Sequence, residues 1–200
     1  MKDYVVMTFG HDCLTHFSKN VNLSLITILS HLGQGSYAHV YLVRVKNPED
    51  NTSQLMALKI LGKSDAACRN FITNVEVEKQ ILIESRHPFV LRLHQTFQCG
   101  SFLYLMLEYA AGGSLFEQLQ RVRRFKEKEV RFFASEIILA LEFLHQNDIL
   151  YRDLKPENVL LDSEGHVKLS DFGLSKILNS KVTNSFCGTL EYMSPEILNE

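Results

Sequence analysis

The sequence lacks the features of secreted, zinc-clustering and membrane-spanning proteins. No C-x-x-C pair occurs, and the eight histidines are dispersed, so neither a disulfide framework nor a His/Cys metal cage is indicated. The cysteines lie far apart, at Cys13, Cys68, Cys99 and Cys187. No run approaches the roughly 20 apolar residues of a membrane span, and charges interrupt the apolar residues near the N-terminus. We therefore expect reduced thiols and a cytoplasmic or nuclear protein.

An excess of positive charge is also missing. The 21 basic and 23 acidic residues give a formal charge of -2, which argues against a surface for nucleic acid or an anionic membrane. Apolar residues make up 46% and charged residues 22%, as in a globular protein with a buried core. We expect one domain, or one domain and part of a second, with no nucleic-acid partner, no membrane span and a monomeric state.

The first half of the chain is predicted to be rich in strands, with a single helix. Residues 1–24 have no clear period and are interpreted as an extension. The expected elements are two strands within 21–45 around a glycine turn, a strand at 55–61, a helix at 65–85, strands at 91–97 and 102–107, and a break at 111–113.

The second half is predicted to begin with helical structure. Apolar residues from Val130 to Leu144 recur at three- and four-residue steps, which predicts an amphipathic helix. Farther along, residues 159–161 and 167–169 flank the turn sequence of residues 162–165, which predicts a short hairpin.

A glycine-containing loop lies between the first two expected strands, from Gly33 to Val40. Glycine accepts dihedral angles that a side chain would forbid, so such a loop can bring backbone N–H groups close to phosphate oxygens. By itself the motif is equally compatible with an ordinary hairpin turn. It is not a dinucleotide fingerprint, because a strand rather than a helix is expected to follow it.

Lys59 is a charged residue within an otherwise apolar strand. A buried ammonium needs a partner, since its desolvation is costly, and Glu78 on the following helix is the natural candidate. The alternative is that the lysine side chain simply extends to solvent.

The richest cluster of polar residues is the loop from Arg152 to Asn158, followed thirteen residues later by Asp171-Phe172-Gly173. Apolar strands are expected on both sides of this cluster. Phosphoryl transfer to a hydroxyl needs a carboxylate to orient the nucleophile, a cation on the moving phosphate, and oxygen ligands for Mg²⁺. This cluster contains each of these groups.

Taken in order, the glycine loop, strand lysine, helix glutamate, R-D-L-K-P-E-N and D-F-G resemble a eukaryotic protein kinase. Tyr151 before the Arg-Asp pair and the segment from Ser185 to Glu196 are similar to the AGC group, above all to the N-terminal kinase domain of ribosomal S-six kinases. The resemblance implies a bilobal α+β fold, with a sheet-rich N-lobe at 25–110 and a partial, mostly helical C-lobe at 111–200.

The resemblance also implies roles for individual residues. Asp153 would orient the substrate hydroxyl, and Lys155 would neutralise the transferred phosphate of ATP. Asn158 and Asp171 would bind Mg²⁺. Lys59, positioned by Glu78, would hold the α- and β-phosphates. The full set implied to bind ATP is Leu32, Gly33, Gln34, Gly35, Ser36, Tyr37, Ala38, His39, Val40, Ala57, Lys59, Leu107, Glu108, Ala110, Glu157 and Leu160.

Within that set, adenine would lie against apolar side chains from both halves, with Leu107 as gatekeeper and backbone groups of Glu108 and Ala110 on its edge. The alternative for the apolar members is plain core packing. Lys155 together with Thr189 implies serine/threonine specificity on protein substrates.

Regulation is implied at Ser185, where a phosphate added by an upstream kinase would face Arg152 and Lys176. The resemblance suggests the phosphoinositide-dependent kinase as that enzyme.

The sequence departs from the family pattern at several places. Ala38 and His39 replace a usual Gly-Lys pair, and Ser114 stands where an acid is common, which leaves Glu157 as a possible partner for a substrate arginine. The arginine partner of Glu196 and the central C-lobe helix lie beyond residue 200 in the family, so we expect residues 1–200 alone to be poorly soluble or inactive. The competing functions are a catalytically inactive regulatory or binding module and, with a poorer fit, a small-molecule kinase.

Overall fold

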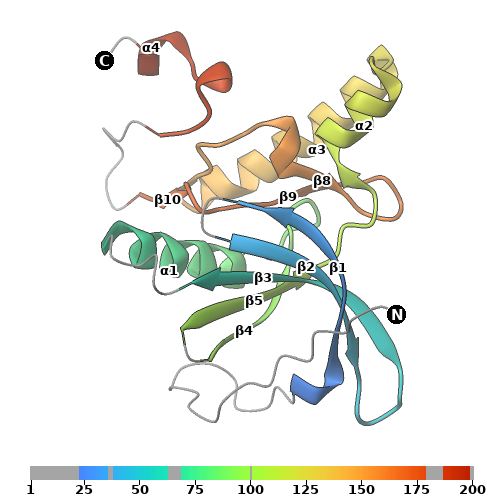
Figure 1. The fold of residues 1–200 in the computed structure, drawn as a ribbon. Helices are drawn as coiled ribbons and strands as arrows, with labels where there is room; N and C mark the ends of the chain where they lie inside the picture. The colour runs from blue at the N-terminus through green and yellow to red at the C-terminus, as the bar shows by residue number, and fades with distance from the viewer. Residues whose placement is uncertain (1–22, 36–37, 63–68, 100, 179–186, 199–200) are drawn as a thin grey trace. The chain divides into compact units, whose positions relative to one another are not determined.

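The computed structural model describes residues 23–35, 38–62, 69–99, 101–178 and 187–198. The chain divides into two compact units (Figure 1). The first, here called the sheet unit, comprises residues 1–72 and 93–109, and the second, the helix unit, comprises 73–92 and 110–200. The lobe boundary predicted near residue 110 stays a prediction.

The sheet unit is built on a five-stranded antiparallel sheet with the strand order β1-β2-β3-β5-β4 (Figure 1). A 3-10 turn at Leu23–Leu25 precedes it, and its strands are β1 (Ile26–Gln34), β2 (Ala38–Lys46), β3 (Ser53–Gly62), β4 (Leu93–Cys99) and β5 (Phe102–Glu108). The sequence predicted these strands with boundaries a few residues away. Hairpins join β1 to β2, β2 to β3 and β4 to β5. Strands β3 and β5 also pair antiparallel, although α1 and β4 lie between them in the chain.

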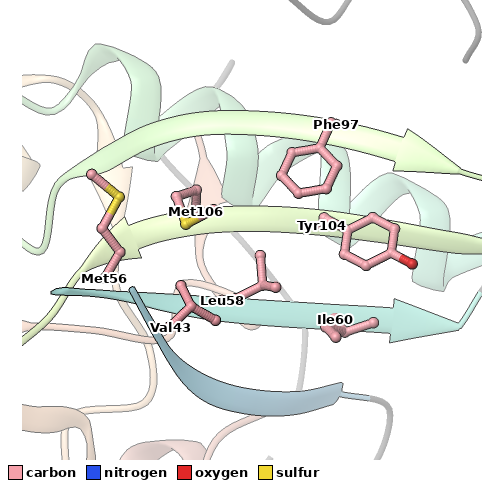
Figure 2. Packing of buried hydrophobic residues seen from close by; sticks show 7 residues of the cluster. All are labelled: Val43, Met56, Leu58, Ile60, Phe97, Tyr104 and Met106. Atoms are coloured by element: carbon pink, nitrogen blue, oxygen red, sulfur yellow. The ribbon is translucent and has the colours of Figure 1, made fainter. Parts of the chain in front are cut away.

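One face of this sheet carries a compact apolar core. Alternate residues of neighbouring strands contribute to it because side chains along a strand point to opposite faces in turn. Figure 2 shows its members, which are Val43, Met56, Leu58, Ile60, Phe97, Tyr104 and Met106. The rings of Phe97 and Tyr104 stack with centroids 4.8 Å apart. The core therefore fixes which residues face the other side.

The helix unit combines helices with short strands. Its helices are α1 (Arg69–Glu84, which starts in the sheet unit), α2 (Leu115–Val122), α3 (Glu127–Gln146) and α4 (Pro195–Leu198), with 3-10 turns at Pro156–Asn158 and Leu190–Tyr192. Strands β6 (Gly113–Ser114), β8 (Val159–Leu161) and β9 (Val167–Leu169) form one sheet, and β7 (Ile149–Leu150) pairs with β10 (Lys176–Ile177). In the described ranges, no helix is both long and apolar enough to span a bilayer.

Helix α3 extends the predicted helix by a few residues at each end. The Lys126 N–H donates to the Glu129 carboxylate at 2.6 Å, so Glu129 satisfies a backbone group that precedes the first turn. The buried side contains Ala140 and Leu144, whereas Ile138 is 63% exposed.

Helix α2 was not predicted, although its start has a recognisable sequence. The Glu117 N–H donates to Ser114 Oγ at 3.1 Å, and the Ser114 N–H donates to Glu117 Oε2 at 2.9 Å. This reciprocal pair is the capping box expected of S-x-x-E. Ser114, considered above only as a missing acid, is the cap of this helix.

The glycine pair at 112 and 113 is a site of close packing. The Gly112 N–H donates to the Leu161 carbonyl at 2.8 Å, and a Cβ at residue 112 would lie 2.9 Å from the same oxygen. Gly113 has a φ of 72°, in the left-handed region that favours glycine. Both glycines are therefore needed for β6 to meet β8.

Candidate active site

The carboxylate of Asp153 lies at the centre of a side-chain network in the helix unit. Asp153 is only 8% exposed. Its Oδ1 accepts from the Thr189 hydroxyl at 2.7 Å, and its Oδ2 accepts from Asn158 Nδ2 at 2.9 Å. Lys155 Nζ lies 3.0 Å from Oδ2 and donates to Thr189 Oγ1 at 2.8 Å. The structure thus brings three of the predicted site residues together, and Thr189 joins them.

Hydrogen bonds to backbone carbonyls hold the loop that carries Asp153, Lys155 and Asn158. The Asn158 N–H donates to the Lys155 carbonyl at 3.0 Å, and the Asn158 side chain also donates to the Asp153 carbonyl at 2.9 Å. The Asn158 carbonyl accepts from both the N–H and the hydroxyl of Ser170, at 2.9 and 3.0 Å. Since Ser170 directly precedes Asp171, these bonds tie the two predicted metal ligands to one frame.

Asp171 is placed by a buried neighbour and an unusual backbone. Its φ is 55° and that of Arg152 is 67°, both in the left-handed region that costs energy for non-glycine residues. Phe172 is fully buried, and its ring and that of Tyr151 form a T-shaped pair with centroids 5.2 Å apart. The Tyr151 hydroxyl donates to the Ser170 carbonyl. Tyr151 therefore holds the backbone on the N-terminal side of Asp171.

Acidic groups gather around Tyr151. Its pKa is raised well above the ordinary value, first by burial and then by the negative charges of Asp171 and Asp153, with a smaller effect of Glu78. A Cβ at Gly173 would lie 3.3 Å from Asp171 Oδ1 and 4.0 Å from Glu78 Oε2, so Gly173 is flanked by two carboxylates. A site with this charge favours cations.

The donor atoms fit magnesium. Asn158 directs its amide nitrogen at Asp153, which leaves the amide oxygen as the atom that can ligate, and the Asp171 side chain is exposed. Carboxylate and amide oxygens are hard ligands that suit Mg²⁺, which usually keeps several waters and completes its shell with substrate phosphates. Across the described part of the chain, no group of three or more His, Cys, Asp or Glu residues could hold a metal without such help.

Arg152 connects the loop to the segment after Asp171. Its Nε donates to the Leu174 carbonyl at 2.7 Å, and the Ser175 hydroxyl donates to the Tyr151 carbonyl at 3.0 Å. Arg152 Nη1 is buried and has no hydrogen-bond partner among the residues that the structure describes. The predicted phosphosite, Ser185, lies outside the described residues.

In the sheet unit, several predicted nucleotide contacts share the face opposite the apolar core. Val40 is paired with Lys59, and Ala57 is paired with Leu107. These positions alternate with core residues, so their side chains lie together on one face. Ala57 and Leu107 are each 7% exposed, which also fits the alternative of core packing.

The glycine loop is closed by a backbone hydrogen bond. The Gly35 N–H donates to the Ala38 carbonyl at 2.8 Å and closes the turn. Neither Gly33 nor Gly35 has a left-handed φ, and a Cβ at Gly33 would meet nothing within 4 Å. Left-handed dihedral angles are therefore not the reason for glycine at these two positions, and the predicted phosphate contact of the loop stays a prediction. What glycine provides is open space beside the strand. Ser36 and Tyr37 lie outside the described residues.

Comparison with known proteins identifies the family of this chain. The sequence matches the family described as "Protein kinase domain" over residues 26–200. The chain belongs to the protein kinase domain family. It is 47% identical to Ribosomal protein S6 kinase 2 alpha of Xenopus laevis over 184 residues, which cover 91% of this chain and 25% of that protein. It is 48% identical to the human Ribosomal protein S6 kinase alpha-2 over 178 residues, which cover 88% of this chain and 24% of that protein.

The predicted α+β kinase fold and the similarity to the S6 kinases of the AGC group are thus confirmed. The chain spans about a quarter of the length of these two relatives.

The remaining predicted residues of the kinase domain are dispersed over both units. Leu32 is 42% exposed on β1, and Gln34 pairs with His39 at the end of the β1–β2 hairpin. Glu108 ends β5. In the helix unit, Glu78 is buried on α1, Ala110 accepts a turn hydrogen bond from Gly113, Glu157 is exposed, and Leu160 is half-buried on β8. The predicted pair of Lys59 and Glu78 joins different units, as does the predicted adenine site, and both stay predictions.

Sequence reasoning missed a second polar network of the kinase domain, between Glu136 on α3 and the residues that begin β9. The signal was available: Glu136 interrupts the apolar face of a predicted amphipathic helix. A charged residue at such a position needs a buried partner.

Proposed function

We propose that this protein is a serine/threonine protein kinase of the AGC type, which transfers the γ-phosphate of ATP to a hydroxyl of protein substrates. The observation that supports it most directly is the buried carboxylate of Asp153, bonded to Asn158, Lys155 and Thr189 at distances of 2.7 to 3.0 Å. Membership in the kinase family supports the same conclusion.

In this proposal Asp153 orients the substrate hydroxyl and accepts its proton. A carboxylate oxygen can accept more than one hydrogen bond, so Oδ1 can bind the substrate while it accepts from Thr189. Lys155 places a positive charge beside the nucleophile and opposes the charge of the transferred phosphate. Most of the rate acceleration would come from this alignment and charge placement.

Asn158 and Asp171 would hold Mg²⁺, which would supply positive charge that offsets the negative charge of the phosphates of ATP. Their backbones are linked through Ser170, so the two ligands keep a fixed spacing. In the sheet unit, Lys59 would bind the α- and β-phosphates, and the face with Val40 and Ala57 would cover adenine.

Activation would depend on phosphorylation of Ser185 by an upstream kinase. The support for this comes from Arg152, whose Nη1 is buried without a partner in the described part of the chain while its Nε is bonded to the Leu174 carbonyl. A phosphate would give the unused nitrogen a strong acceptor. The Ser185→Ala variant is expected to lose the activated rate, and unchanged activity in the intact protein would exclude this switch.

The decisive experiment measures transfer of labelled phosphate from ATP to a pool of protein and peptide substrates by the intact protein. We expect transfer to serine and threonine that requires Mg²⁺ and is lost in the Lys59→Met variant. Glu164→Gln, an exposed change in the β8–β9 turn, is the control. A thermal-shift titration with Mg-ATP runs in parallel. Nucleotide binding without transfer, also after activation by an upstream kinase, would favour the regulatory-module alternative instead.

A further inference from the structure

Glu136 is a buried carboxylate that does not belong to the set of residues proposed to act on ATP. It lies in the middle of α3 and is 5% exposed, on the same side of the helix as Ala140, which is fully buried. An ionised carboxylate in such a place is costly unless it is hydrogen-bonded. Both of its oxygens are used. Oε1 lies 2.6 Å from His166 Nδ1, and Oε2 accepts from the Val167 N–H at 2.8 Å.

The two partners of Glu136 stand at the beginning of the strand that leads to Asp171. Val167 is the first residue of β9. At the other end of β9, the Leu169 N–H donates to the Phe89 carbonyl at 2.8 Å, and the Leu169 carbonyl accepts from Leu91 at 2.9 Å. Ser170 then bonds to the Asn158 carbonyl. A series of hydrogen bonds thus runs along β9 from Glu136 to the residue before Asp171.

The surroundings of His166 strengthen the tie. Its pKa is raised, first by the hydrogen bond to Glu136, then by the Glu136 charge, with smaller contributions from Asp162 and Glu164. The rings of Phe132 on α3 and of Phe89 flank the imidazole, with centroids 5.6 and 6.4 Å away. A raised pKa means that the ionic part of the tie is present at low pH and is lost as the pH rises through the pKa of the folded protein.

We propose that Glu136 is a positioning residue of the kinase site, which fixes the start of β9 and thereby the placement of Asp171 and of the Asn158 carbonyl. This rests on the proposed function, in which Asp171 binds the metal. Glu136 touches neither substrate nor metal and acts through the strand. Groups that orient metal ligands from outside typically change metal affinity or activity by about 10–100-fold when they are lost.

The experiment compares Glu136→Ala and Glu136→Gln with the wild type in the intact protein. Glutamine keeps an acceptor for the Val167 N–H but removes the charge that faces His166. Glu142→Gln, an exposed acid on the same helix, is the matched control. Metal binding is followed without turnover, through the water-proton relaxation of Mn²⁺ in the presence of ATP, and the Mg²⁺ dependence of phosphate transfer is measured beside it.

We expect Glu136→Ala to weaken Mn²⁺ binding by about 10-fold or more and to raise the Mg²⁺ requirement equally. Glu136→Gln should show a smaller change in the same direction, and Glu142→Gln none. In Glu136→Gln the pKa of His166, measured by NMR of the imidazole, should fall from its raised value toward the ordinary histidine value of 6.5. The pH dependence of Mn²⁺ binding that follows the His166 titration in the wild type should disappear.

Two outcomes would overturn the role proposed for Glu136. If both Glu136 variants melt at lower temperature but bind Mn²⁺ as the wild type does, the residue is only structural and the inference is overturned. The same holds if the His166 pKa is unchanged in Glu136→Gln. If the wild type binds Mn²⁺–ATP but transfers no phosphate, the proposed function fails, whereas the Mn²⁺ and NMR measurements still decide the role of Glu136.

Discussion

The two units of this kinase domain place their candidate residues in different ways. In the sheet unit, Val40, Ala57 and Lys59 share a face because strand pairing and the alternation of side chains put them there. In the helix unit, Asp153 meets Thr189 through a hydrogen bond between residues 36 positions apart. The arrangement in the sheet unit depends only on the register between neighbouring strands. The arrangement in the helix unit depends on the fold of the whole unit. Single substitutions should therefore affect stability and activity differently in the two units.

The largest effect is expected from Asp153→Asn, which removes the charge at the centre of the helix-unit network. Loss of a group that accepts or orients the proton lowers the rate by about 10²–10⁴-fold. The amide oxygen of the introduced asparagine can still accept from Thr189, so the melting temperature should change little. Steady-state transfer assays and thermal unfolding test this together. Comparable kcat in Asp153→Asn and the wild type would remove Asp153 from the proposed chemistry.

Leu58→Ala should destabilise the sheet unit, because it removes packing from the apolar core. Leu58 is 3% exposed within the core, whereas Leu55 on the same strand is 43% exposed. Truncation of a buried leucine costs about 2–5 kcal/mol, and truncation at an exposed position typically changes stability by less than about 0.5 kcal/mol. Denaturant unfolding of Leu58→Ala and Leu55→Ala checks the difference. Equal losses in the two variants would contradict the described core.

Substitution of glycine by alanine should lower stability in the helix unit at Gly188 but not in the sheet unit at Gly33. Gly188 has a φ of 119°, and a Cβ there would lie 2.8 Å from the Arg152 carbonyl oxygen. Gly188→Ala is expected to cost about 1–3 kcal/mol locally and to disturb the Thr189 contact with Asp153. Gly33→Ala meets open space and should not destabilise the protein. Hydrogen exchange of residues 187–193 together with thermal unfolding distinguishes the pair, and equal protection in Gly188→Ala would show that the strain is absent.

A smaller effect on stability is expected at His87. Its pH dependence should have the opposite sign to that of His166, because the pKa of His87 is lowered and that of His166 is raised. Its ring stacks on Phe143 at 4.9 Å, its Nδ1 accepts from the Phe89 N–H, and burial lowers its pKa below 6.5. A lowered pKa means that the contribution to stability is complete above about pH 6.5 and is lost as the pH falls below it. His87→Phe should keep the stack and flatten the fall in melting temperature between about pH 7 and 5.

The exposed His145 on α3 provides the control for that experiment. His145→Gln should leave the acid-induced fall in melting temperature as it is in the wild type. If the melting temperatures of His87→Phe and His145→Gln fall equally with pH, burial of His87 is not the cause of the acid-induced destabilisation.

The smallest change in stability is expected on the outer side of α3. Ile138 is 63% exposed beside Leu139, which is 46% exposed, and neighbouring exposed apolar side chains favour association. Ile138→Glu should alter the free energy of unfolding by less than about 0.5 kcal/mol while it raises the concentration at which the protein aggregates. Light scattering at increasing concentration tests this. A loss of several kcal/mol would mean that the Ile138 side chain is packed against another segment.

The same contrast explains what the sequence could predict. The strands and α3 followed from periodicity, because alternation and helical repeats are local properties of the chain. The predicted strand at 91–97 was wrong at its start, since the residues around Val90 and Leu91 pair with Leu169 and β4 begins at Leu93. That partner lies far along the chain, and no local pattern indicates it.

Within the candidate site, the residue types were predictable and the bonds between them were not. The motifs pointed to Asp153, Lys155 and Asn158, but the hydroxyl that bridges two of them comes from Thr189 after a long intervening segment. The Glu136 network was not predicted from the sequence, although an acid among the apolar residues of an amphipathic helix needs a partner if it is buried.

Tyr151 offers a practical consequence. Nitration and iodination attack the phenolate, and Tyr151 is 2% exposed with a raised pKa, whereas Tyr192 is 52% exposed. Tyr192 should therefore be modified early, and Tyr151 only after the ring has been released from the Ser170 carbonyl. The ratio of the two labelled peptides in a mass spectrum would then give a direct measure of how much of a sample has the loop from Arg152 to Asn158 intact.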